Sequence, residues 1–441
     1  MRMVDIIEKK RDGLELSADE IATMIAGYCQ DEIPDYQMAA MLMAVYFRGM
    51  TDQEIAALTL AMARSGKMVD LSGVSGVKVD KHSTGGVADT TTLVLAPLVA
   101  AAGVPVAKMS GRGLGFTGGT IDKLESIPGF RTGLSSEEFI ANLKRYNIAV
   151  TAQTPDITPA DGKMYALRDV TGTVDSIPLI ASSIMSKKIA AGADKIVLDV
   201  KAGSGAFMKN VGEAVKLAEA MVNIGKLVGR ETIAVITSMA EPLGVSVGNS
   251  LEVEEALDIL SGTVESEDLR HVCLALGSYM LVAANKAVDI KTAQAKLSEL
   301  LLNGQALDKF KELVAAQGGN PGIVTRKSRL LKAAMVSVKT AESGYVIAVD
   351  TAAIGYSAMI LGAGREYKGQ KIDLGAGLVM KCRIGDYIRQ GDVVAELYTN
   401  NSARIKEAAD KVIQAVQLGG KAVVKPKLIL GIVNANGVEL Y

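Results

Sequence analysis

Histidine, cysteine and tryptophan are scarce in this chain of 441 residues, which has two histidines, three cysteines and no tryptophan. The cysteines are an odd number, lie far apart at Cys29, Cys273 and Cys382, and form no C-x-x-C pair. This spacing excludes a disulfide framework and predicts free thiols in a reducing compartment. If the chemistry needs an imidazole, only His82 and His271 can supply it, and His82 lies in a glycine-rich loop.

An excess of charge and a long apolar run are also lacking. Lys and Arg number 48 against 49 Asp and Glu, so no basic excess indicates a nucleic-acid partner. The longest apolar stretch, 90–107, is broken by Pro97, Gly103 and Pro105, which excludes a membrane span there. The first residues alternate charged and apolar side chains, unlike a secretory signal. We therefore expect a cytoplasmic protein without nucleic-acid or membrane partners.

The patterns that are present predict an α/β protein of more than one domain. Residues 1–66 read as helices, with capping-box spacing at Ser17 and Thr51. From residue 77 short apolar runs alternate with helical segments, which is typical of a mostly parallel sheet covered by helices. We expect a small all-helical lobe, a large mixed α/β lobe with a central mostly parallel sheet, and a C-terminal α+β domain. The predicted boundaries are 1–66 rejoined by 163–193 for the helical lobe, 67–162 with 194–335 for the α/β phosphate-binding domain, and 340–441 for the C-terminal domain.

Two glycine-rich polar loops, 81–90 and 108–120, lie on either side of the apolar segment 91–102. Each loop combines glycines and hydroxyls with a lysine. Such loops suit an anion, because glycine lets backbone N–H groups approach closely and a following helix N-terminus adds a positive dipole end. A helix beginning near Asp89 would direct that end at the first loop. A lone glycine cluster is more often a plain turn, but two such loops in tandem favour a phosphate site.

Five motifs of the chain resemble those of the thymidine and pyrimidine-nucleoside phosphorylases, in the same order and spacing over essentially the whole length. They are Lys81–Gly86, Ser110–Glu125, Tyr165–Asp169, Ser176–Lys188 and Asp199–Met208. The resemblance implies reversible phosphorolysis of pyrimidine nucleosides such as uridine, thymidine and deoxyuridine. Inorganic phosphate would be the co-substrate, and the products would be the free base and (deoxy)ribose 1-phosphate. No organic cofactor is implied.

The resemblance also implies which residues form the site. The phosphate-binding positions are Lys81, His82, Ser83, Thr92, Lys108, Met109, Ser110 and Thr120, with His82 and Met109 acting through their backbone. The base-reading positions are Arg168, Ser183 and Lys187, of which Ser183 and Lys187 share one helix face. Arg168 and Lys187 would stabilise the leaving base, so they count with His82 as catalytic. His82 either protonates the base or stabilises its oxygen, or it only packs and holds phosphate.

A potassium site is implied as well, built of hard oxygen ligands at Ala88, Thr90, Leu243, Ser246 and Glu255. Two positions depart from the pattern of the family. Ala88 stands where glycine is commoner, and Phe116 stands where histidine is commoner. Lys108 in its Ala-Lys-Met-Ser context resembles the broad-specificity branch. A homodimer through the N-terminal helices is expected, and the methionines there are expected to form a packed core or a subunit contact.

Two other functions compete with this interpretation. An anthranilate phosphoribosyltransferase-like glycosyltransferase would share the helical lobe, the α/β lobe and a glycine loop, but it would use magnesium and a pyrophosphorylated sugar. The hairpin motif near Ile384–Glu396 resembles biotinyl and lipoyl carrier domains, which would make residues 344–400 a binding or scaffold module. No carrier lysine stands on a matching turn, so a structural domain is expected there.

Overall fold

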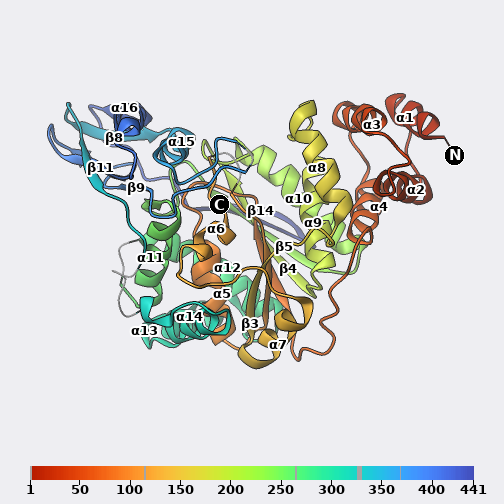
Figure 1. Cartoon of the computed structure of the whole chain (residues 1–441), viewed down its shortest axis with the longest axis horizontal. Helices are drawn as coiled ribbons and strands as arrows, with labels where there is room; N and C mark the ends of the chain where they lie inside the picture. Colours follow the sequence, from red (N-terminus) through yellow and green to blue (C-terminus); the bar gives the residue numbers. More distant parts are fainter. Residues whose placement is uncertain (1, 114–115, 264–265, 325–329, 368) are drawn as a thin grey trace.

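The computed structural model of the chain describes residues 2–113, 116–263, 266–324, 330–367 and 369–441. Figure 1 shows three parts: a helical lobe at the upper right, a central sheet with helices around it, and a C-terminal part at the upper left. Within the described ranges, no helix has the length and apolar character that crossing a membrane requires.

The helical lobe combines four N-terminal helices with two from the middle of the chain. Its elements are α1 (Met3–Arg11), α2 (Ala18–Cys29), α3 (Asp35–Arg48), α4 (Asp52–Ala63), α8 (Pro159–Thr171) and α9 (Ile177–Ala190). The capping boxes at Ser17 and Thr51 both form, so α2 and α4 begin where the sequence predicts. Met38 and Met41 are buried in one core with Met164 of α8, and the methionine stripe therefore fills the interior of this lobe.

The central sheet has five strands in the order β1-β4-β5-β13-β14. The first three are parallel to one another, whereas β13 and β14 are antiparallel to their neighbours. A separate parallel pair, β2 and β3, lies beside them. The bounds are β1 (Val79–Ser83), β2 (Val106–Ser110), β3 (Ile148–Ala152), β4 (Lys195–Ala202), β5 (Glu231–Ser238), β13 (Ile429–Asn434) and β14 (Gly437–Leu440). The predicted fold class, with its mostly parallel sheet, is confirmed.

Helices bury both faces of this sheet, as a parallel sheet requires. Val197 and Val235 face a core shared with α5 and α12, whereas Ile196 and Leu198 face one shared with α9 and α10. Helix α5 begins at Thr91 and is buried over nearly its whole length, as the apolar segment predicts. The remaining helices of this part are α5 (Thr91–Ala101), α6 (Thr120–Glu125), α7 (Ser136–Tyr146), α10 (Val211–Leu227), α11 (Asn249–Leu260), α12 (Glu267–Ala283), α13 (Ile290–Leu302), α14 (Gln305–Ala316) and the 3-10 turn η1 (Pro321–Ile323).

The C-terminal part is built of two small sheets and two helices. Its elements are β6 (Ser246–Val247), β7 (Met335–Lys339), β8 (Gly344–Val349), α15 (Thr351–Leu361), β9 (Gly377–Met380), β10 (Tyr387–Ile388), β11 (Val393–Tyr398), η3 (Ser402–Arg404), α16 (Ile405–Ala415) and β12 (Val416–Gly419). Strand β6 reaches in from the α/β part to pair with β9. Beyond β12 the chain returns to the central sheet, where β13 pairs with β5 and β14 pairs with β13.

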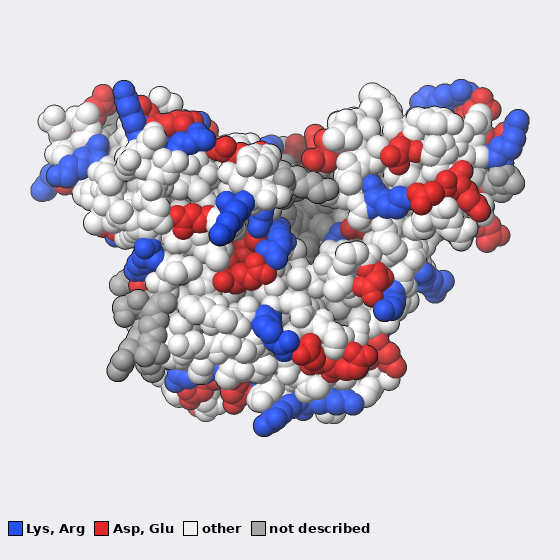
Figure 2. All heavy atoms as spheres, in the orientation of Figure 1, with Lys and Arg blue, Asp and Glu red and all other residues white. Residues whose placement is uncertain are grey.

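The surface is hollowed between the helical lobe and the C-terminal part. Figure 2 shows this notch at the top of the molecule, with basic and acidic side chains along its rim. The carboxyl ends of β1 and β4 point toward the loops with the candidate site residues, which is where open α/β sheets bind ligands.

Candidate active site

The first glycine loop leaves the carboxyl end of β1 and leads into α5. Gly85 has a φ of +94°, a conformation that side-chain-bearing residues rarely adopt, so glycine is needed at this turn. The amide of Gly85 donates to the hydroxyl of Ser83 at 3.1 Å. The loop thus brings Ser83 and the N-terminus of α5 together above Lys81.

Lys81 is buried, and its positive charge is already paired with a carboxylate of the protein. Its ammonium donates to the hydroxyl of Thr91 and lies 3.3 Å from Oδ2 of Asp199 on β4. The same carboxylate oxygen lies 2.8 Å from Nζ of Lys201, and its other oxygen accepts from the hydroxyl of Thr237 at 2.6 Å. Two lysines therefore share one aspartate, and an arriving anion would compete with Asp199 for Lys81.

Lys108 on β2 forms the second buried cation. Its Nζ donates to the backbone oxygen of Lys81 at 2.6 Å and lies 3.3 Å from Oδ1 of Asp80. Burial, aided by the charge of Lys188 and opposed by Asp80, lowers the pKa of Lys108 to about 7. The contact to the Lys81 carbonyl joins β1 and β2, so the two predicted loops belong to one site.

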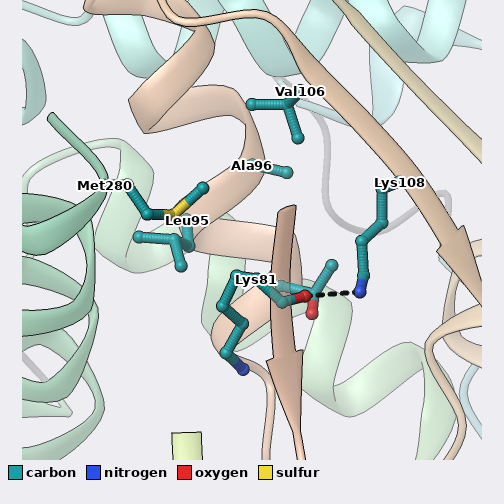
Figure 3. A pocket seen from close by; sticks show the side chains of 7 residues that line it. Lys81, Leu95, Ala96, Val106, Lys108 and Met280 are labelled. Atoms are coloured by element: carbon teal, nitrogen blue, oxygen red, sulfur yellow. Dashed lines mark hydrogen bonds between the residues drawn. The ribbon is translucent and has the colours of Figure 1, made fainter. Parts of the chain in front are cut away.

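A small cavity is lined by Lys81 and Lys108 together with apolar side chains. Figure 3 shows Lys81 and Lys108 at its edge, with the hydrogen bond between them, and apolar side chains opposite. Its volume is about 10 Å³, room for roughly one water molecule. This cavity is therefore too small for a phosphate ion. The lining residues are Lys81, Thr92, Leu95, Ala96, Val106, Lys108 and Met280.

The hydroxyl residues of the predicted phosphate site are less buried than its two lysines. Ser83, Thr92, Ser110 and Thr120 are partly exposed, whereas Lys81 and Lys108 are buried. Hydroxyl donors together with buried positive charge suit a doubly charged oxyanion. The structure brings the two loop segments together through the bond from Lys108 to the Lys81 backbone oxygen and the bond from Lys123 to the Asp89 backbone oxygen.

The signature loop after β2 is closed by contacts between its two ends. A Cβ on Gly119 would lie 2.0 Å from the amide nitrogen of Gly113, so only glycine fits there. The amide of Gly113 donates to Oδ2 of buried Asp122 at 2.7 Å, and Arg365 of the C-terminal part pairs with both oxygens of that carboxylate. Leu114 and Gly115, two further positions of the motif, lie outside the described residues.

The base-reading residues lie on α8 and α9. Lys187 donates to Oγ of Ser183 at 2.8 Å, one turn earlier on α9, and pairs with Oδ2 of Asp161 on α8. Burial lowers the pKa of Lys187, although Asp161 opposes this shift. The predicted pair on one helix face is therefore present, with an aspartate as a third member.

Arg168 is buried, and the turn between α8 and α9 already uses much of its guanidinium. It donates to the backbone oxygens of Thr173 at 3.2 Å, Leu179 at 3.2 Å and Val174 at 2.5 Å. A guanidinium has five N–H donors, so three contacts leave capacity for a ligand. Arg168 therefore holds the turn that positions α9 against α8.

His82 lies on β1 between Lys81 and Ser83 and is partly exposed. Desolvation lowers the pKa of its imidazole well below the usual range, and the charges of Lys188, Lys108, Lys187 and Lys81 lower it further. These lysines come from α9, β2 and β1, so positive charge from both halves of the site acts on the imidazole. At neutral pH it is therefore uncharged in the free protein.

The residues of the implied potassium site also converge. The carbonyl of Ala88 accepts from the amide of Thr90 at 3.0 Å and from Gly244 at 3.2 Å, which joins the first loop to the turn containing Leu243 and Ser246. Glu255 of α11 accepts from the amides of Val245 and Ser246 and from the hydroxyl of Ser266.

Glu255 is the observation that fits a cation at this position. Burial raises the pKa of its carboxyl group, and within the described ranges no lysine or arginine pairs with it. A buried carboxylate with only neutral donors is suited to a monovalent cation, because the cation would favour its ionised form. The described residues hold no cluster of three or more carboxylate, thiol or imidazole side chains. The implied potassium ligands are one carboxylate with carbonyl and hydroxyl oxygens, so they do not constitute a cluster of that kind.

The two departures from the family pattern have visible consequences. Ala88 has a φ of +55°, the left-handed region where glycine is at ease. The ring of Phe116 lies 5.0 Å from that of Tyr356 on α15. Phe116 therefore packs against the C-terminal part, where a histidine would offer a polar ring.

Sequence reasoning missed the acidic partners of the site lysines and one further lysine. These are Asp80, Asp199, Asp161 and Lys188. Each lies within or next to a motif, but its pairing joins residues as far as 118 positions apart. The one sequence signal for these pairings is that Asp80 and Lys81 are consecutive residues of β1.

Three family models match successive parts of the chain. Residues 4–66 match the helical bundle domain of a glycosyl transferase family, and residues 75–307 match the a/b domain of that family. Residues 345–419 match the pyrimidine nucleoside phosphorylase C-terminal domain, so the hairpin motif lies in a domain characteristic of phosphorylases.

Curated relatives match the chain over nearly its full length. The pyrimidine-nucleoside phosphorylase of Geobacillus stearothermophilus is 53% identical over 97% of this chain and 99% of its own. The protein of the same name from Bacillus subtilis (strain 168) is 54% identical over the same shares. Among solved structures, anthranilate phosphoribosyltransferase from Thermus thermophilus superposes with a TM-score of 0.59 at 21% identity, covering 70% of this chain and 98% of that one. This likeness shows a shared fold.

Proposed function

The chain belongs to the pyrimidine-nucleoside phosphorylase family, and we propose from this membership that its site catalyses reversible phosphorolysis of pyrimidine nucleosides. The substrates are uridine, thymidine and deoxyuridine with inorganic phosphate, and the products are the free base and (deoxy)ribose 1-phosphate. The geometry that supports the proposal is the bond from Lys108 to the backbone oxygen of Lys81, together with the contact of α9, which holds the Lys187–Ser183 pair, with β1 and β2.

Phosphate binds on the loop side of Lys81 and Lys108. The dianion takes these ammonium groups over from Asp199 and Asp80, and the hydroxyls of Ser83, Thr92, Ser110 and Thr120 donate to its remaining oxygens. The backbone of His82 and Met109 lines the same site. Phosphate is thereby held next to the sugar, and this positioning removes much of the entropic cost of bringing the two reactants together.

The base half stabilises the leaving group. Phosphate attacks the anomeric carbon while the glycosidic bond breaks, and negative charge develops on the pyrimidine. Lys187 and Arg168 would supply the positive charge that stabilises the leaving base, and Ser183 would help to orient the ring. Asp161 holds the ammonium of Lys187 toward α8 and must share it with the base.

His82 acts as a neutral imidazole when catalysis begins. Its lowered pKa favours donation of a hydrogen bond to a base oxygen over transfer of a proton. Phosphate binding would add negative charge beside the ring and raise its pKa, so general-acid catalysis becomes available only with phosphate in place.

Three further properties belong to this proposal. A potassium ion would bind at Ala88, Thr90, Leu243, Ser246 and Glu255, neutralise Glu255 and hold the first loop on the turn 243–246. Two chains would associate through the N-terminal helices, where Tyr36 and Phe47 are 74% and 76% exposed. The location would be the cytoplasm, in keeping with the free thiols of Cys29, Cys273 and Cys382.

Release of uracil from uridine tests the function. We expect release that depends on inorganic phosphate and persists in the presence of EDTA, with thymidine and deoxyuridine also accepted. Release that requires magnesium, or transfer from a pyrophosphorylated sugar in place of phosphorolysis, would favour a phosphoribosyltransferase. For potassium, thermal unfolding in KCl is compared with tetramethylammonium chloride at equal ionic strength. Stabilisation by KCl that is lost in Glu255→Gln is expected.

A further inference from the structure

Lys188 is a buried lysine that the mechanism above does not use. It lies in the last turn of α9 and is 3% exposed. Its Nζ is 2.8 Å from Oδ2 of Asp80 on β1 and donates to the backbone oxygen of Met109 on β2 at 3.3 Å. One side chain of the base-reading helix therefore contacts both strands of the phosphate site.

Its neighbour Lys187 points in a different direction. Successive residues of a helix are about 100° apart, so Lys187 pairs with Asp161 of α8 while Lys188 reaches into the α/β part. The last turn of α9 thus links the two halves of the site, with the base-reading lysine on one side and the strand contacts on the other.

Asp80 is the residue at which this link meets the phosphate site. Its Oδ1 lies 3.3 Å from Nζ of Lys108, and its Oδ2 lies 2.8 Å from Nζ of Lys188. Although close to Lys188, Oδ2 has no partner with hydrogen-bond geometry among the residues that the structure describes. One buried carboxylate therefore pairs with two ammonium groups. If an anion draws Lys108 away, the attraction between Asp80 and Lys188 becomes stronger.

We propose that Lys188 and Asp80 are positioning residues that couple phosphate binding to the position of α9. The inference rests on the proposed function, because it takes phosphate as the anion at Lys108. When the dianion binds, Lys108 turns to it and Asp80 pairs with Lys188 alone. The tighter pair holds the last turn of α9 against β1 and β2, with Lys187 in place for the base. Phosphate and base therefore bind with positive coupling.

The coupling is measured as a ratio of affinities, which a merely structural ion pair would not change. The dissociation constant of inorganic phosphate is determined by calorimetry without uracil and with saturating uracil. In the unsubstituted chain we expect uracil to tighten phosphate binding by about fivefold or more, and phosphate to tighten uracil binding equally. Lys188→Met should reduce the ratio to about one to two. Lys188→Arg, which keeps the charge, should restore part of it.

Lys78→Met is the matched control. Lys78 is also buried, and its Nζ pairs at 2.8 Å with Asp194 in the connection that follows α9, away from the phosphate lysines. The control should keep the coupling of the unsubstituted chain even if it lowers stability. A ratio near one in the unsubstituted chain, or an unchanged ratio in Lys188→Met, would overturn the proposal.

Hydrogen exchange tests the same point without a substitution. Inorganic phosphate alone should slow exchange of the amides in the last turn of α9, which phosphate does not touch, and leave α16 unchanged. Unchanged exchange in α9 with phosphate bound would overturn the inference. These binding measurements need no turnover. Failure of uridine phosphorolysis would count against the proposed function, whereas phosphorolysis without coupling would count against this inference alone.

Discussion

The phosphate half and the base half of the site hold their cations in different ways. In the phosphate half, Lys81 and Lys108 are fixed on strands of two neighbouring sheets, β1 and β2, and paired with Asp199 and Asp80. In the base half, the cations are on two helices, and Arg168 donates to three backbone oxygens of its own turn. The phosphate lysines are thus held by β-strands. The base-reading residues are held by hydrogen bonds between α8 and α9 and within the turn that joins them.

This difference indicates how each half would respond to its ligand. Because the phosphate lysines are buried with aspartates, their charge is available but costly to desolvate, and an anion exchanges one ionic partner for another. In the base half, Lys187 contacts both Asp161 on α8 and Ser183 on α9, so a base that takes up its ammonium disturbs the contact between these helices. Substitutions in each half separate the two modes of support.

Replacing His82 tests the junction and should have the largest effect. His82→Asn removes the imidazole near both halves, and kcat should fall by about 10²–10⁴-fold if the ring transfers a proton or donates to the base. Steady-state kinetics with uridine measures this. His271→Asn is the control, because His271 is exposed on α12 and is the other histidine of the chain. A loss confined to the KM for phosphate would place His82 in the phosphate half alone.

Replacing Lys187 tests the base half. Lys187→Met keeps the apolar stem and removes the ammonium, so kcat/KM for uridine should fall by about 10²–10³-fold, the effect of removing one charge-stabilising donor. Lys163→Met is the control in the same lobe, since Lys163 pairs with exposed Asp31. Near-normal kcat/KM in Lys187→Met would remove this residue from the base site.

Replacing Arg168 separates support of the turn from contact with the base. Arg168→Met leaves the carbonyls of Thr173, Val174 and Leu179 without their donor, so the free energy of unfolding should fall by about 2–4 kcal/mol. Urea unfolding measures this. Arg131→Met, which removes an exposed pair with Glu138, should cost less than about 1 kcal/mol. Unchanged stability with lost activity would assign the guanidinium to the base instead of the turn.

The pH dependence of phosphate affinity tests the phosphate half. With a pKa of about 7 in the free protein, Lys108 is mostly neutral at pH 8 and above, and binding a dianion requires its protonation. Binding then takes up a proton, so affinity should weaken by up to about tenfold per pH unit from pH 8 to pH 9. Calorimetry in two buffers of different ionisation enthalpy would detect the proton. Lys108→Arg should flatten the profile, because guanidinium stays charged. A flat profile in the unsubstituted chain would contradict the shift.

Local signals predicted the fold where contacts are local. The capping boxes at Ser17 and Thr51 set two helix starts, and the apolar run after Asp89 forms α5. The return of the chain to the central sheet as β13 and β14 was not predictable in this way. Strand β13 pairs with β5, some 190 positions earlier, and nothing in its own sequence specifies that partner.

The candidate site likewise has a part that local sequence signals predict and a part that they do not. Glycines, hydroxyls and lysines in two loops predict an anion site without any relative, because each loop is contiguous in sequence. The base-reading pair on α9 has only helical spacing in the sequence, and it is the family resemblance that identifies it. The pairing of Lys188 with Asp80 lay beyond both routes, since a buried ion pair between distant residues follows only from the packing of α9 on β1.

The smallest expected effect concerns two of the non-glycine residues with a left-handed backbone, Ala88 in the first glycine loop and Thr158 at the start of α8. Ala88→Gly relieves about 1–2 kcal/mol of backbone strain. Two contributions act in the opposite direction and destabilise the folded chain. The added freedom of glycine in the unfolded state costs about 0.4–1 kcal/mol, and the lost burial of a methyl group costs about 0.8 kcal/mol. These terms nearly cancel, so unfolding free energy should change by less than about 0.5 kcal/mol. Thr158, with a φ of +50°, differs because its buried hydroxyl accepts from Gln153. Thr158→Gly should destabilise the chain by about 1 kcal/mol or more. Urea unfolding of both variants gives the comparison, and equal changes would show that backbone strain dominates at both positions.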